Sequence, residues 1–211
     1  MFSVDTAKYP SDNLIRFIAK YFYGTKTRNK VKILEIGSGG GCNLWFLSRE
    51  GFDTYGIDIS DVAISKAKDF LNSENCSVNL TLGDISKLNY PNKFFDAVID
   101  NECLYSNDKK NSTNIINEIK RVLKINGLFY SRTYSLGSYV GKAIQISKYE
   151  FKDSIDGPFM DTGSFRLSDN ESINDMYGKV FSILSIDELN HTRNNGKMNI
   201  KELVVIAKRY E

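Results

Sequence analysis

Residues 31–41, with the sequence VKILEIGSGGG, decide the fold of this chain. The segment begins with a short apolar run, typical of a buried parallel strand, and ends with four glycines in the five positions 37–41. A helical pattern of apolar residues follows at Leu44, Trp45 and Leu47. Glycines at such a turn let a ligand approach bare peptide N–H groups at the start of a helix. The stretch therefore predicts a strand, a tight ligand-binding turn and a helix.

The spacing of these glycines departs from the dinucleotide-binding fingerprint G-x-G-x-x-G. That fingerprint would need a glycine at position 42, where this chain has Cys42, and the observed spacing is G-x-G-x-G. The third glycine of the fingerprint serves close helix packing, so its absence disfavours a nicotinamide-dependent oxidoreductase. That class stays open as the weaker enzyme alternative.

Outward from this stretch the chain alternates predicted strands and helices. A first helix is predicted from a cap at Ser11 or Asp12 to a stop at Gly24. The further predicted strands are 54–58, 78–84, 95–100 and 128–134, and the further predicted helices are 60–71 and 111–123. This alternation predicts an α/β, Rossmann-like, doubly wound and mostly parallel sheet with helices on both faces. Ligands of such sheets bind at the carboxyl ends of the strands.

The last third of the chain breaks this rhythm. Residues 135–165 are rich in glycine and aromatic residues, and Val140 to Tyr149 is a candidate helix within them. A helix is predicted over 168–177. Two strands, 180–189 and 200–209, are joined by Asn194-Asn195-Gly196, a turn that suits an antiparallel hairpin.

Two acidic residues follow the second and third predicted strands. Asp58 lies 21 positions after Gly37, where a carboxylate can accept both ribose hydroxyl hydrogens of a nucleoside. Asp84 can accept from an exocyclic adenine amine, and Ile59 and Ile85 can sandwich the ring. Helix capping is the competing interpretation of both acids, and more strongly of Asp84.

At this point the sequence resembles the class I S-adenosylmethionine-dependent methyltransferases of the small-molecule type. The resemblance rests on five segments that occur in the family's order and cover residues 31 to about 134: ILEIGSGGG (33–41), YGIDIS (55–60), GDI (83–85), FDAVID (95–100) and RVLKINGL (121–128). It implies S-adenosyl-L-methionine as the cofactor and seven strands with an antiparallel last strand beside the fifth. The implied cofactor-binding residues are Glu35, Gly37, Ser38, Gly39, Gly41, Asn43, Asp58, Ile59, Asp84, Ile85 and Asp100.

The resemblance divides a single methyltransferase domain, 1–211, into functional parts. Residues 1–30 would form an N-terminal helical cap, 31–134 the cofactor-binding core, 135–165 an insertion that acts as a lid, and 166–211 a C-terminal helix with strands six and seven. Tyr9 in the cap would help to close the site. Tyr105, near where relatives often have histidine, is the catalytic candidate, with a plain core tyrosine as the equal alternative.

Charged residues outside these segments give weaker candidates. His191 is the only histidine and would be the default base on chemistry alone, but its polar surroundings favour a surface position. Arg132 and Arg166 are the candidates for binding an anionic acceptor through their planar guanidinium groups, ahead of Arg193. Each arginine can also be structural.

Composition narrows the function classes. The 211 residues (24.0 kDa) fit one domain, and a net charge of +2 is too small to support nucleic-acid binding by itself. No apolar run is long enough to span a membrane, and three scattered cysteines favour the reducing cytoplasm, without a metal site. We therefore expect a cytoplasmic methyltransferase that acts on a small molecule. A non-catalytic module that binds S-adenosylmethionine or S-adenosylhomocysteine is the alternative, because methyl transfer does not require a catalytic side chain.

Overall fold

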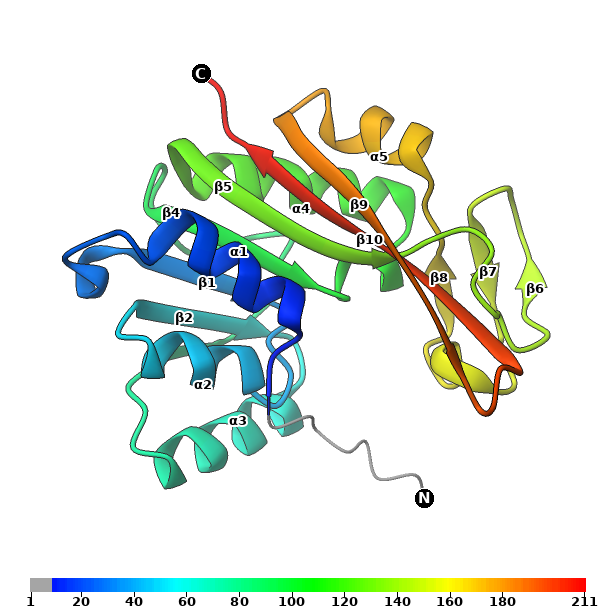
Figure 1. Ribbon diagram of the computed structural model, residues 1–211, viewed down its shortest axis with the longest axis horizontal. Coiled ribbons are helices and arrows are strands. Elements are labelled where there is room, and N and C mark those ends of the chain that lie inside the picture. Colours follow the sequence, from blue (N-terminus) through cyan, green and yellow to red (C-terminus); the bar gives the residue numbers. More distant parts are fainter. Residues whose placement is uncertain (1–8) are drawn as a thin grey trace.

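The protein, a computed structural model that describes residues 9–211, is built on a seven-stranded sheet (Figure 1). The strand order is β3-β2-β1-β4-β5-β10-β9; the first five of these are parallel, and β10 is antiparallel to both of its neighbours. The predicted α/β fold class is therefore confirmed. The strand bounds are β1 Lys32–Ile36, β2 Asp53–Asp58, β3 Asn79–Leu82, β4 Phe95–Asn101, β5 Leu123–Tyr134, β9 Ser182–Arg193 and β10 Met198–Lys208.

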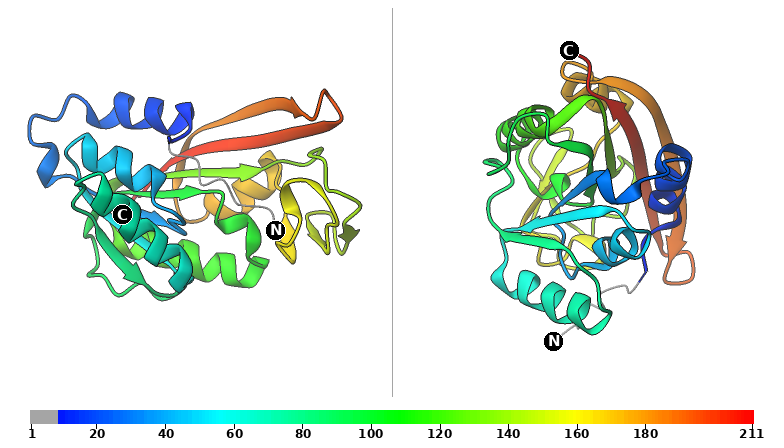
Figure 2. Two further views of the ribbon diagram at one scale, coloured as in Figure 1. Left: turned by 90° about the horizontal axis from the view of Figure 1, so that it is seen from below. Right: turned by 90° about the vertical axis from the view of Figure 1, so that its left-hand side faces the viewer.

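Helices cover both faces of this sheet, and α1 and α4 lie on opposite sides of it (Figure 2). The five helices of residues 9–211 are α1 Asp12–Phe22, α2 Cys42–Arg49, α3 Asp61–Ser73, α4 Lys109–Val122 and α5 Asn170–Tyr177. Single 3₁₀ turns lie at Arg28–Lys30, Leu104–Ser106 and Gly157–Phe159. No helix within residues 9–211 is long and apolar enough to cross a lipid bilayer.

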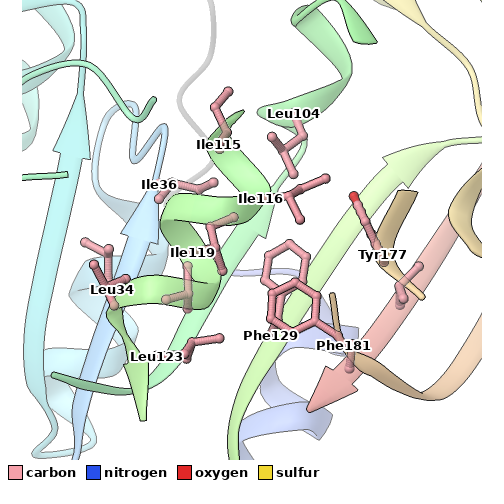
Figure 3. Close-up of a cluster of buried hydrophobic side chains, with 14 of the residues drawn as sticks. Leu34, Ile36, Leu104, Ile115, Ile116, Ile119, Leu123, Phe129, Tyr177 and Phe181 are labelled. Atoms are coloured by element: carbon pink, nitrogen blue, oxygen red, sulfur yellow. The ribbon is translucent and has the colours of Figure 1, made fainter. Parts of the chain in front are cut away.

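Alternate residues of the central strands β1, β4, β5 and β10 enter two separate cores, because successive side chains of a strand point to opposite faces. Leu34 and Phe129 pack with Ile116, Ile119 and other residues under α4 and α5 (Figure 3). The neighbouring strand residues face the other way and pack beneath α1 and α2. Both faces of β1 are thus buried, which is why its sequence is almost continuously apolar.

The helix starts follow the capping residues in the sequence. The Oγ atoms of Ser11 and Ser60 accept hydrogen bonds from the N–H groups of Leu14 and Ala63. The hairpin predicted for the last two strands is also present. β9 and β10 are joined through Asn194, Asn195 and Gly196, all of which have positive φ angles. The antiparallel hairpin is confirmed.

The segment after β5 forms a second, three-stranded sheet of β6 (Ile144–Gln145), β7 (Glu150–Lys152) and β8 (Ser164–Arg166). The helix predicted over Val140 to Tyr149 is therefore wrong. Gly141 has a φ of +56°, and a Cβ there would lie 1.9 Å from the carbonyl oxygen of Asp156, so the chain turns sharply where a helix would continue. Ile144 is exposed, so the apolar spacing did not mark a buried face.

An aromatic cluster fixes this small sheet beyond the carboxyl ends of β4 and β5 (Figure 1). The cluster consists of Tyr105, Tyr134, Phe151, Phe159 and Phe165. The rings of Phe159 and Phe165 stack with centroids 4.2 Å apart, and Phe159 lies 4.7 Å from Tyr134. The insertion thus shares a small aromatic core with Tyr134 at the end of β5 and with Tyr105 in the turn after β4.

The insertion leaves and rejoins the main fold at one place. Ser135 and Ser168 form a β-bridge, and the N–H of Ser168 donates to the carbonyl oxygen of Tyr134 at 2.9 Å. The N–H of Leu136 donates to the carbonyl oxygen of Ser168 at 2.8 Å. The two ends of the insertion are therefore neighbours at the end of β5.

Candidate functional site

The glycine loop lies between β1 and α2, and its backbone is left-handed at three positions. Gly37, Gly39 and Gly41 have φ angles of +62°, +51° and +85°. A Cβ on Gly37 would lie 2.3 Å from Sγ of Cys103, in the turn after β4. Gly37 is therefore required twice, by its φ angle and by the close approach of the two segments.

Asp58, at the end of β2, holds this loop in place. Its Oδ2 accepts from the N–H of Gly39, and its Oδ1 accepts from the N–H of Ser60, both at 2.9 Å. Ser60 itself caps α3, so capping is not the role of Asp58. Because a carboxylate oxygen can accept two hydrogen bonds, each oxygen keeps one acceptor position for a ligand.

A cavity of about 400 Å³ opens at the carboxyl ends of the strands, a size typical of small-molecule sites. It brings together five of the predicted cofactor residues: Gly37, Asp58, Ile59, Asp84 and Ile85. It adds five residues from the turn after β4 and the start of α4: Glu102, Cys103, Ser106, Asn107 and Asn111. Glu102 and Cys103 directly follow the predicted strand 95–100, at whose carboxyl end a ligand was expected, whereas no sequence signal marked the other three.

Three more predicted residues lie beneath the loop rather than along the cavity. Glu35 is buried, and its Oε1 accepts from Nδ2 of Asn43 at 2.6 Å. Its Oε2 and the Oγ of Ser38 are buried without a hydrogen-bond partner within residues 9–211. Buried polar atoms are nearly always satisfied, so these two atoms beside the loop fit a polar ligand bound there. Together with a turn that admits only glycine at position 37, they fit the adenosyl cofactor that the sequence implies.

The pKa of the Glu35 carboxyl is raised to about 8, mainly because the group is buried. The hydrogen bond from Asn43 lowers this pKa, whereas the nearby carboxylates of Asp100 and Asp58 raise it. A carboxyl with a raised pKa stabilises the fold below its ordinary pKa of 4.5, and this contribution is lost as the pH rises through about 8. Ionised Glu35 is thus a destabilising group at alkaline pH.

We expect Glu35→Gln to remove this pH dependence. Glutamine keeps an oxygen that accepts from Asn43, and it cannot ionise. The unfolding free energy of the variant, relative to wild type, should therefore rise between about pH 5 and pH 8, by an amount on the order of a few kcal/mol. Urea unfolding without cofactor measures it. Glu188→Gln, which changes an exposed carboxylate, is the matched control and should show no such trend.

Asp100, at the end of β4, is fully buried and shapes the turn that follows it. Its Oδ1 accepts from the N–H groups of Cys103 and Leu104 at 2.9 and 3.0 Å, and Ser131 Oγ donates to Oδ2 at 2.6 Å. Asp100 does not line the cavity. It acts on the site through the position of Cys103 against Gly37.

The predicted catalytic and substrate residues lie apart from one another. Tyr105 belongs to the aromatic cluster, 5.0 Å from Tyr134 between ring centroids, and does not line the cavity. Tyr9 is 65% exposed, with its ring edge-on to Trp45. His191 is exposed on β9, as its polar surroundings predicted.

Both candidate arginines have protein partners. Arg132 is paired with Glu202 and Glu102. Arg166 is 7% exposed, and it donates to the carbonyl oxygen of Asn107 at 2.7 Å and to Ser112 Oγ at 2.9 Å. It lines a different cavity, of about 340 Å³, near α5. Neither guanidinium reaches the cavity at the strand ends, and their roles in substrate binding stay predictions.

Comparisons with known proteins agree with this geometry. Residues 34–131 match a family model described as a methyltransferase domain. Three proteins of Schizosaccharomyces pombe, each named an uncharacterized methyltransferase, are 42% identical over 74 residues, which is 35% of this chain and 51% of each relative. The match thus spans about half the length of these relatives.

Two solved structures show the same fold at low sequence identity. An S-adenosylmethionine-dependent methyltransferase of Methanosarcina mazei has a TM-score of 0.74 and 18% identity, over 96% of this chain and 99% of that one. The 1,6-didemethyltoxoflavin-N1-methyltransferase of Burkholderia thailandensis, solved with 1,6-didemethyltoxoflavin and S-adenosylhomocysteine, has a TM-score of 0.65 and 15% identity, over 85% and 71%.

The fold and the site define a doubly wound α/β protein with a cavity at the carboxyl ends of its first strands. Residues 34–131, a little under half of the chain, match the methyltransferase-domain family, and the fold is that of the S-adenosylmethionine-dependent methyltransferase of Methanosarcina mazei. S-adenosyl-L-methionine is the cofactor that the sequence motifs imply.

Proposed function

We propose that the protein transfers the methyl group of S-adenosylmethionine to a small-molecule acceptor. The observation that carries this proposal is the single cavity that joins the glycine loop with Asp58, Ile59, Asp84 and Ile85. The cofactor supplies a methyl group that is already activated by the positive sulfur. The protein's part is to bind both molecules, align them and exclude water, which can lower a barrier by about 7 to 11 kcal/mol.

The residues that line the cavity bind different parts of the cofactor. Asp58 accepts the ribose hydroxyls with the acceptor positions left free by Gly39 and Ser60. Ile59 is 76% exposed, so its side chain is available to cover one face of the adenine, opposite Ile85. Asp84 has one oxygen engaged by the N–H of Ser86 at 2.7 Å and one that can accept from the adenine amine.

The buried residues support this arrangement from below. Glu35, Ser38 and Asn43 fix the first turn of α2 and offer the unsatisfied oxygen and hydroxyl to the amino-acid end of the cofactor. Gly39 and Gly41 have no side chains, so the ligand can approach the backbone of the loop. Asp100 holds the facing turn.

A small acceptor is favoured by what surrounds the cavity. The insertion 135–165 lies beyond the ends of β4 and β5, where it can act as a lid over an acceptor (Figure 1). Tyr9, in the N-terminal cap, packs edge-on against Trp45 of α2. The Burkholderia enzyme with the same fold holds a small heteroaromatic molecule together with S-adenosylhomocysteine. We also propose a cytoplasmic location, which suits three cysteines that are all free thiols.

Methyl-labelled S-adenosylmethionine tests the proposal. The protein is incubated with the label and with separate small-molecule, protein and RNA fractions of a cell extract. We expect label in the small-molecule fraction, and none when Asp58→Ala replaces the wild type. Label in the protein or RNA fraction would contradict the acceptor class. If no fraction is labelled although calorimetry detects cofactor binding, the chain is a non-catalytic binding module; heat from NAD alone would support the oxidoreductase alternative.

A further inference from the structure

Glu102, the first residue after β4, has an unusual backbone. Its φ angle is +61°, in the left-handed region, which costs a residue with a side chain about 1 to 2 kcal/mol. The conformation is held by the N–H of Glu102, which donates to the carbonyl oxygen of Arg132 at 2.9 Å. Strain of this kind concentrates at functional sites, and Glu102 lines the cavity.

The carboxylate of Glu102 belongs to a buried cluster with one cation and two acids. Arg132 Nη1 lies 3.1 Å from Glu102 Oε1, and Arg132 Nη2 donates to both oxygens of Glu202 at 2.7 and 2.8 Å. Tyr134 Oη donates to Glu102 Oε2 at 2.9 Å. Glu202 is 1% exposed and is matched by the guanidinium, so the cluster has one negative charge in excess, at its cavity end.

The cavity itself has the same sign. Its lining residues within 9–211 include Asp58, Asp84 and Glu102, and none of them is lysine, arginine or histidine. Asp58 and Asp84 have cofactor roles in the proposed function, which leaves Glu102 for the acceptor. The pKa of Glu102 is raised, mainly because its carboxyl group is buried. The positive charge of Arg132 lowers this pKa, and the negative charge of Glu202 raises it. Glu102 therefore holds a proton more readily than an exposed glutamate does.

We propose that the acceptor is a small amine that enters as its ammonium ion and that Glu102 removes the proton from its nitrogen. This inference rests on the proposed methyltransferase function. Glu102 takes one proton from the ammonium, whose N–H electron pair stays on nitrogen as the nucleophilic lone pair. The new nitrogen–carbon bond forms as the sulfur–carbon bond breaks, and the electrons of that bond neutralise the sulfur. Glu102 then releases its proton to water, and the product leaves as a methylated ammonium ion.

The other members of the cluster position this base. Arg132 Nη1 and Tyr134 Oη each contact one oxygen of Glu102, and Glu202 fixes Arg132. An anionic acceptor would meet the excess negative charge of the cluster. Arg132 thus contributes to acceptor choice through Glu102 rather than by contact with an anion.

The test compares Glu102→Gln with wild type and with the control Glu188→Gln, whose carboxylate is exposed on β9. The small-molecule fraction of an extract is separated by ion exchange into basic, neutral and acidic pools, and each is incubated with methyl-labelled S-adenosylmethionine. We expect wild type to label the basic pool. Glu102→Gln should lower the initial rate about 100-fold or more, since general-base catalysis contributes on that scale. Wild-type rates should rise with pH on an acidic limb that the variant lacks.

Calorimetry separates this role from cofactor binding. The affinities of Glu102→Gln for both S-adenosylmethionine and S-adenosylhomocysteine should stay within about twofold of wild type. A loss confined to S-adenosylmethionine would show instead that Glu102 balances the positive sulfur, and would overturn the inference. Glu102→Gly relaxes the left-handed backbone and provides a second inactive variant, whose fold is checked by circular dichroism.

Other outcomes are also decisive. Label in the acidic or neutral pool, or a Glu102→Gln rate within about threefold of wild type at every pH, would overturn the role of Glu102 while leaving the methyltransferase function intact. A wild-type protein that binds S-adenosylhomocysteine and labels no pool would contradict the methyltransferase function, and this inference with it.

Discussion

Replacement of Asp58 by alanine is expected to weaken binding of S-adenosylmethionine at least about 100-fold and to leave the fold intact. The carboxylate has one free acceptor position on each oxygen, toward the two ribose hydroxyls. Hydrogen bonds to a charged group contribute about 1.5 to 3 kcal/mol each, so the loss of two costs about 3 kcal/mol or more. Each 1.4 kcal/mol is a factor of about ten in affinity.

Titration calorimetry with S-adenosylmethionine and S-adenosylhomocysteine measures this effect, and circular dichroism checks the fold. Asp69→Ala, which removes an exposed carboxylate on α3, is the matched control and should bind as wild type does. An affinity of Asp58→Ala within about threefold of wild type would show that the ribose is held elsewhere.

Gly37→Ala is expected to destabilise the protein by about 2 to 5 kcal/mol and to impair cofactor binding as well. A left-handed φ of +62° costs alanine about 1 to 2 kcal/mol. Its Cβ would lie 2.3 Å from Sγ and 2.7 Å from Cβ of Cys103, and overpacking of this kind costs about 1 to 3 kcal/mol more. The clash pushes the glycine loop and the turn after β4 apart, and both line the cavity.

Gly51→Ala isolates the backbone part of this effect. Gly51 has a φ of +85°, and nothing lies within 4 Å of a Cβ placed there, so only the conformational cost applies. Urea unfolding should give Gly51→Ala the smaller loss. Adding Cys103→Gly to Gly37→Ala should recover stability, because both clashing atoms are then gone. Equal losses for the two single variants would refute the contact between Gly37 and Cys103.

The fold was predictable where local signals and the architecture agree. The strand that ends at Ile36 is apolar because both of its faces are buried, and the hairpin at Asn194, Asn195 and Gly196 has the left-handed residues that its turn needs. The helix prediction over 140–149 failed because its apolar spacing is not a buried face: Ile144 and Ile146 are exposed in strands and loops of the small sheet.

Only one half of the cavity, lined by Gly37, Asp58, Ile59, Asp84 and Ile85, was predictable from the sequence. Asp58 and Gly37 follow from strand ends and glycine spacing, which are local. Arg132 and Glu202 lie 70 positions apart in the chain and meet because β10 returns antiparallel beside β5. The φ angle of Glu102 has no signature in its residue type, since glutamate rarely adopts a left-handed backbone. Long-range pairing therefore creates the side of the cavity where we propose that the acceptor binds.

The shared entry and exit of the insertion at Ser135 and Ser168 has an evolutionary consequence. Because both ends meet at one point on the rim of the sheet, the insertion can lengthen, shorten or be exchanged without altering the path of β5 or α5. Such a change would leave Gly37, Asp58 and Asp84 in place, because these cavity residues belong to other strands and loops. Under the proposed lid role, residues 135–168 are the natural unit to graft between homologues, and such a graft must keep the hydrogen bonds of Arg166 to Asn107 and Ser112.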